Sequence, residues 1–120
     1  MRTNGGIEKE NDRLVQVWAS LQKSYISGSR KNIVGHHFYS RGTKLLRWDI
    51  RNIIPLTFEE HADVHNGKLS IEIKNPFREK FLDEMSKKNF KDYLLENNLT
   101  EKDFAIRCNK KLKEKISEVL

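Results

Sequence analysis

The stretch NIIPLTFEEHADVHNGK, from Asn52 to Lys68, predicts a strand that runs directly into a helix. Its opening, NIIPL, is rich in β-branched residues, and its proline favours an edge strand or a strand end. Thr57 and Glu60 then have the spacing of a capping box, in which each side chain accepts a hydrogen bond from the backbone amide of the other. We therefore expect a helix that begins at Phe58 and ends near the NG dipeptide, since Asn and Gly tolerate the left-handed conformation found at helix ends.

A first strand is expected upstream of this segment. Residues Ile33 to Tyr39 (IVGHHFY) are rich in β-branched and aromatic residues. Between them and NIIPL lies SRGTKLLRWDIR, a basic loop of twelve residues that is longer than a tight hairpin requires and is therefore a candidate for function. Trp48 in this loop has apolar neighbours, which favours a place in the core over stacking on bases.

Helical patterns flank the two strands and their helix. Within residues 8–25, apolar residues recur at helical spacing and form one stripe, namely Leu14, Val17, Trp18, Leu21 and Tyr25. Downstream, LSIEIK is expected to be briefly extended, and residues 75 and 76 (NP) have the pattern of a helix cap and first turn. The helix they open, to about residue 88, has an apolar face made of Phe77, Phe81, Leu82 and Met85. A short helix in FKDYLLENN and a last helix capped by Thr100 follow.

These elements predict an α+β fold, in which a short β-hairpin plus a helix form the core and N-terminal and C-terminal helices flank it. A chain of 120 residues has the length of a single domain, residues 1–120. Its parts are the N-terminal helix at 8–25, the strand–strand–helix segment at 33–68 and the C-terminal helices at 76–120.

The composition favours a soluble protein of the cytoplasm. A single cysteine, Cys108, excludes an intramolecular disulfide bond and a zinc site built from cysteine pairs. No apolar run approaches the roughly 20 residues that a transmembrane helix needs, and the first residues lack the apolar stretch of a signal peptide. We therefore expect no membrane partner.

The positive charge is concentrated in one part of the chain. Lysine and arginine number 23 against 17 acidic residues, a net charge of +6. Residues 28–56 contain one acidic residue, Asp49, and six basic residues, so this segment carries +5 of the net charge. The six basic residues are Arg30, Lys31, Arg41, Lys44, Arg47 and Arg51. Such patches bind phosphate-rich partners by releasing counterions, which favours nucleic acid, while a merely solvated charged face is the alternative.

All four histidines lie within thirty residues, in two pairs. His61 and His65 are four residues apart on the expected helix, so both imidazoles lie on one face and can reach one cation. Taken alone, such a pair is more often a packing or surface feature. His36 and His37 are neighbours on an expected strand and face opposite sides, so one suits a metal ligand and the other an acid–base group; taken alone, they fit one core and one exposed histidine.

The segment from Ile33 to Lys68 resembles the HNH endonucleases, which have the ββα-metal fold. The matching features are the HH doublet, Asn52 at the opening of NIIPL, and His61 nine residues later. HADVHNGK is similar to the corresponding helix of the colicin-type nucleases, and HHFYSRG with LRWD and NIIPL is similar to small HNH proteins of phages and mobile elements. The resemblance implies a DNA endonuclease, in the host cytoplasm if the chain is phage-encoded.

The resemblance also implies a role for each matching residue. His36 and His61 would be metal ligands, with His65 a third as in the colicin-like branch, and His37 would be the general base. Asn52 would hold the loop behind His37 through hydrogen bonds to the backbone. One departure is that many HNH proteins carry CxxC pairs for a structural zinc, and this chain has none. The cofactor implied is one divalent metal ion, with Mg, Mn, Zn, Ni and Co all left open.

Four basic residues of the loop have a natural role as contacts to DNA phosphates, and we rank Arg47 first among them: Arg41, Lys44, Arg47 and Arg51. The alternative is that some of them pair with Asp49 or with acids of the helices. The sequence thus predicts a metal-dependent endonuclease that cleaves DNA. It leaves open a nucleic-acid-binding or assembly module without catalysis, a purely structural zinc, and whether the chain forms a homodimer.

Overall fold

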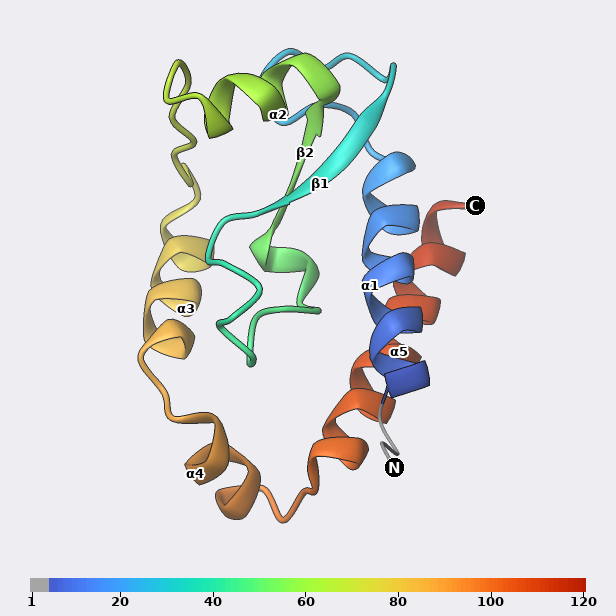
Figure 1. Ribbon diagram of the computed structural model, residues 1–120, viewed down its shortest axis with the longest axis vertical. Coiled ribbons are helices and arrows are strands. Elements are labelled where there is room, and N and C mark those ends of the chain that lie inside the picture. Colours follow the sequence, from blue (N-terminus) through green and yellow to red (C-terminus); the bar gives the residue numbers. More distant parts are fainter. Residues whose placement is uncertain (1–4) are drawn as a thin grey trace.

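The computed structural model describes residues 5–120, and within them the fold is α+β (Figure 1). A two-stranded antiparallel sheet lies between a long helical pair on one side and a shorter helix on the other. The elements in chain order are α1 (Gly5–Ser20), β1 (Ile33–His37), a 3₁₀ turn (Ile50–Asn52), β2 (Ile53–Thr57), α2 (Phe58–His65), α3 (Pro76–Ser86), α4 (Phe90–Glu96) and α5 (Glu101–Val119). The predicted hairpin, following helix and flanking helices are confirmed.

Gly35 and Pro55 face each other at the centre of the hairpin. The N–H and the carbonyl of Gly35 face α1, where the Gln16 side chain accepts from the N–H at 2.8 Å and donates to the carbonyl at 3.1 Å. A Cβ on Gly35 would lie 2.8 Å from Ile53 Cγ2 and 3.0 Å from Ala19 Cβ. Glycine therefore allows α1 to pack directly on β1.

The capping box predicted at the start of α2 is present. Thr57 Oγ1 accepts from the Glu60 amide at 3.1 Å, and the Glu60 carboxylate accepts from the Thr57 amide at 2.9 Å. Ser24 Oγ donates to the same carboxylate at 2.6 Å, which ties the chain after α1 to this cap. After α2, Gly67 has a φ of +73°, in agreement with the predicted helix end.

The two faces of the hairpin support two apolar clusters. Ile53 lies in the cluster formed with α1 and α5, which run side by side in Figure 1, while Ile54 lies in the cluster formed with α3. Trp48 is 8% exposed within the first cluster, as predicted. Between α1 and α5, buried Asn109 donates to Asn11 at 3.0 Å, and Asn11 donates to the Ala105 carbonyl at 3.0 Å.

Several predicted boundaries are wrong. The N-terminal helix ends at Ser20 and not at residue 25, since the Ser24 hydroxyl accepts from the amides of residues 26 and 27 and turns the chain. The first strand ends at His37 because the Asn52 side chain accepts from the amide of Tyr39. The segment LSIEIK forms no strand, although Ile73 is buried.

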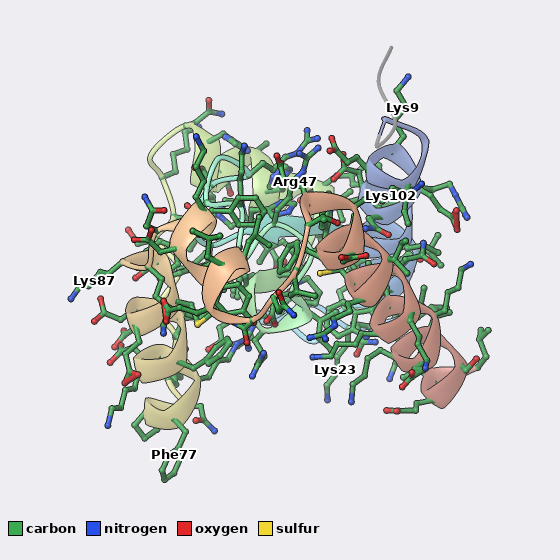
Figure 2. The ribbon with its side chains drawn as sticks, turned by 90° about the horizontal axis from the view of Figure 1, so that it is seen from below. Lys9, Lys23, Arg47, Phe77, Lys87 and Lys102 are labelled. Carbon is green, nitrogen blue, oxygen red and sulfur yellow. The ribbon has the colours of Figure 1, made fainter. Side chains whose placement is uncertain are left out.

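The apolar face predicted for α3 is partly wrong. Leu82 is buried, but Phe77 is 83% exposed and projects away from the protein in Figure 2. The helix also ends at Ser86, two residues earlier than expected.

None of the helices within residues 5–120 combines the length and apolar character that crossing a membrane requires.

Candidate metal centre

Three of the four histidines come together at the junction of β1 and α2. His36 comes from β1, and His61 and His65 come from one face of α2. One ring nitrogen of each lies within 4.8 Å of those of the other two, and the Nε2 atoms of His61 and His65 are 3.0 Å apart. The hairpin causes this arrangement, since β2 leads without a break into α2 and pairs His36 with Ile54 close to that helix.

This donor set fits a divalent transition metal. Four ligands at 2.0–2.1 Å from a tetrahedral zinc ion lie roughly 3.4 Å from one another, so small side-chain rotations suffice to bring the three nitrogens onto one ion. Three protein ligands also leave a coordination position open. Imidazole suits zinc, nickel, cobalt and similar ions, and a site without carboxylate ligands leaves the full charge of the ion directed at an anion.

The surroundings of His36 and His61 favour the neutral imidazole that metal ligation requires. Burial, followed by the proximity of His61, His65 and His37, lowers the pKa of His36 to about 4. Burial and then the neighbouring His65 also lower the pKa of His61. The unprotonated rings of His36 and His61 are therefore the dominant form at neutral pH.

His37 does not join this cluster, but it opens onto the same pocket. The histidine pocket, about 540 Å³ in volume, is lined by α1, β1, α2 and the start of the basic loop: Asp12, Gln16, Gly35, His36, His37, Phe38, Ser40, Arg41, His61 and His65. His37 Nε2 lies 2.8 Å from the carbonyl oxygen of Arg47. A carbonyl only accepts, so Nε2 carries the proton of the neutral ring and Nδ1 is left as the proton acceptor.

Burial lowers the pKa of His37, and the hydrogen bond to the Arg47 carbonyl opposes that shift only in part. The nearby Arg41 and Arg47 charges lower this pKa as well, while Asp12 raises it. His37 is thus neutral at pH 7, with one nitrogen fixed and the other able to accept a proton.

Asn52 is completely buried beneath the basic loop. Its Oδ1 accepts from the Tyr39 amide at 2.8 Å, and its Nδ2 donates to the carbonyls of Tyr39 at 2.9 Å and Leu46 at 3.2 Å. These bonds close the loop that carries Arg47, whose carbonyl contacts His37. The expected hydrogen bonds to the backbone are present, and they place Asn52 behind His37 as a support.

The structure separates the four basic residues that the sequence grouped together. Arg41 lines the histidine pocket and bonds to Asp12 at 2.7 Å. Arg47, ranked first as a phosphate contact, is instead engaged by the same carboxylate, which accepts from its Nη2 at 2.6 Å and its Nε at 3.0 Å. The Arg47 side chain is 23% exposed and a carboxylate occupies its fork, which argues against that first rank.

The other two basic residues do not line the histidine pocket. Arg51 pairs with Asp49 at 2.7 Å and lies over the Phe81 ring, 3.5 Å from its centroid. Lys44 lies 5.5 Å from the centroid of Phe90. Three of the four basic residues therefore pair with a carboxylate, which is the alternative stated above. Arg51 pairs with Asp49, and Arg41 and Arg47 pair with Asp12 of α1.

Sequence reasoning missed Asp12 and Gln16, which α1 presents to the histidine pocket. Asp12 accepts from Trp48 Nε1 at 2.8 Å as well as from the two arginines. Burial opposes its ionisation, but the hydrogen bonds from Arg47 and Trp48 and the two arginine charges outweigh that effect and lower the pKa of Asp12. The available signal was the spacing of four between Asp12 and Gln16, which places two polar residues on one face of the helix.

Comparison of the chain with protein-family models, with curated proteins and with solved structures finds no match. The assignment to the HNH endonucleases therefore stays a prediction.

Proposed function

We propose that the protein is a metal-dependent endonuclease that hydrolyses DNA phosphodiester bonds at the histidine pocket. One observation carries the proposal, namely that three imidazoles converge beside a fourth, His37, whose Nε2 is held by a backbone carbonyl. Three histidines by themselves are also consistent with an ion that only stabilises the fold. The separately held His37 in the same pocket adds the proton acceptor that hydrolysis needs.

His36, His61 and His65 are the residues that would hold the ion. When bound, a divalent ion supplies positive charge that stabilises the phosphate oxygens and the departing 3′-oxygen. His37 Nδ1 accepts the proton of the attacking water, a role typically worth about 10²- to 10⁴-fold in rate. The expected products carry 5′-phosphate and 3′-hydroxyl ends.

Two neighbouring histidines offer a matched pair of variants. His37→Ala is expected to bind Zn²⁺ or Ni²⁺ as the wild type does, but to cleave supercoiled plasmid about 10²- to 10⁴-fold more slowly. His36→Ala is expected to lose both metal affinity and cleavage. Calorimetric titration of the metal and gel assays of nicking with Mg, Mn, Co, Ni and Zn give the two readouts.

The alternative, a DNA-binding or assembly module without catalysis, makes a different prediction for the same assays. It predicts DNA binding that a chelator leaves unchanged, with wild type and His37→Ala equally inert in every metal. That result would sink the proposed reaction while leaving the DNA partner in place.

A further inference from the structure

A basic groove lies beyond the histidine pocket along the basic loop, and one of its two walls comes from outside the segment that resembles the HNH family. It is formed between residues 42–45 of the basic loop and the junction of α3 and α4, and its volume is about 550 Å³. Lys44 lines it from the loop, and Lys88 and Lys91 line it from the junction. We call it the lysine groove.

Positive charge dominates the lysine groove. Three lysines and one acidic residue, Glu101, line it, which leaves a formal charge of +2. All three lysines are exposed, and within residues 5–120 none of them has a carboxylate oxygen within 4.0 Å. Lys87, by contrast, pairs with Asp83 at 3.0 Å and extends from the edge of the molecule in Figure 2. The three ammonium groups of the groove are therefore available to an external anion.

The ammonium group of Lys44 lies over an aromatic ring. Its Nζ lies 5.5 Å from the centroid of Phe90, the first residue of α4, and Phe90 itself lines the groove. Leu45, next to it in the loop, is buried in the core. The cation of the loop is thus held against the helix that carries Lys91, so cations from two distant parts of the chain meet in one place.

The lysine groove continues the histidine pocket along the chain. Ser40 and Arg41 line the histidine pocket, and residues 42–44 line the groove. The Cα atoms of Arg41 and Lys44 are three residues apart and so at most about 11 Å from each other. A strand of duplex DNA presents a phosphate about every 3.4 Å along the helix axis, so one strand can contact both places.

We propose that the lysine groove binds the phosphate backbone of double-stranded DNA beside the segment that enters the histidine pocket. Lys44, Lys88 and Lys91 are the contacts, and they add affinity and orientation without reading sequence. The inference takes DNA as its ligand from the proposed function. It gives the α3–α4 junction, which lies outside the resemblance, a role in binding that substrate.

The test measures binding in EDTA, so that cleavage plays no part. The double variant Lys88→Gln, Lys91→Gln and the wild type are titrated against a fluorescein-labelled DNA duplex, and anisotropy gives Kd from about 50 to 200 mM NaCl. Each lost phosphate contact lowers the slope of log K against log salt by roughly 0.9. The wild-type Kd is therefore expected to rise about 12-fold more over this range than the Kd of the variant.

Lys23→Gln, Lys110→Gln is the matched control, since it removes the same charge from two exposed lysines that do not line the groove. Figure 2 shows Lys23 on the side of the molecule away from Arg47. The control is expected to keep the wild-type slope. An equal loss in both variants, an unchanged slope in the groove variant, or no DNA binding by the wild type at low salt would each overturn the inference. Because the nuclease proposal is tested by cleavage with metal, failure of the two is distinguishable.

Discussion

At the scale of single residues, Asp12 has the largest effect on how the candidate site is held. One carboxylate accepts four hydrogen bonds, two from Arg47 and one each from Arg41 and Trp48. It thereby fixes the loop segment whose carbonyl holds His37. The same bonds draw two arginines of the basic loop toward α1, so charge that appears free in the sequence is partly neutralised in the fold.

Asp12→Asn is expected to destabilise the protein by about 1–2 kcal/mol at pH 7, because charged hydrogen bonds are lost at a site that solvent partly screens. The pKa of Asp12 is lowered in the folded state, so its contribution is complete above the unfolded pKa, roughly 3.9, and is lost as pH falls through the lower folded value. Urea unfolding of the wild type and the variant from pH 7 down to pH 3 measures the loss of stability and its dependence on pH. A variant whose stability equals that of the wild type at pH 7 contradicts this account.

Asn52 is the second residue whose removal is costly. Asn52→Ala removes three hydrogen bonds to the loop backbone and leaves the part-buried N–H and carbonyl of Tyr39 without a partner, and it is expected to cost about 3 kcal/mol of unfolding free energy. Asn97→Ala is the control, because Asn97 is exposed and donates a single hydrogen bond, to the Tyr93 carbonyl. Chemical denaturation of the two variants compares them. Equal losses would mean that the loop does not depend on Asn52.

At the scale of elements, the local signals were enough to predict the strand–helix unit and the capped starts of α3 and α5. The Thr57–Glu60 cap and Gly67 are set by neighbours in the chain, so the sequence pattern located α2 within a residue or so. The end of α1 depends on Ser24, whose partner Glu60 is 36 residues away. No local pattern reports such a contact, and the helix was predicted five residues too long at its C-terminal end.

The same reasoning explains which parts of the site were predictable. His61 and His65 converge because of helical spacing, and His36 reaches them because the hairpin is short. The partner of Arg47 was not predictable, since Asp12 lies 35 residues away in α1 and no local sequence pattern indicates such a pair. Tertiary pairing decided which cations remain free.

Gly35→Ala tests the contact between α1 and β1. The added Cβ would meet Ile53 and Ala19 at 2.8 Å and 3.0 Å, so overpacking is expected to cost about 1–3 kcal/mol. Gly6→Ala in α1 is the control, since a Cβ there meets nothing within 4 Å and alanine favours the helix by up to about 1 kcal/mol. Thermal unfolding of both variants provides the comparison. A Gly35→Ala variant as stable as the wild type would show that α1 stands further from the sheet.

At the scale of the whole molecule, the helices that flank the hairpin supply the apolar contacts that stabilise it. The first cluster joins α1, the hairpin and α5, and the second joins the hairpin and α3. The histidines lie at the edge of this core, and His65 is exposed. The fold is therefore expected to form without an ion.

Treatment with EDTA is expected to leave the melting temperature of the wild type unchanged. Added Zn²⁺ at about 100 times its Kd should stabilise the folded state by about 2.7 kcal/mol, and His61→Ala should abolish that gain. Differential scanning fluorimetry with and without chelator measures the effect. Unfolding on chelation alone would favour the reading in which zinc is purely structural.

X-ray absorption spectroscopy of the zinc-loaded protein tests most directly the claim that three imidazoles hold one ion beside His37. We predict three imidazole nitrogens at 2.0–2.1 Å in the wild type, with one fewer in His36→Ala and the same three in His37→Ala. A spectrum that shows oxygen ligands only, or one that changes with His37 and not with His36, would contradict the account.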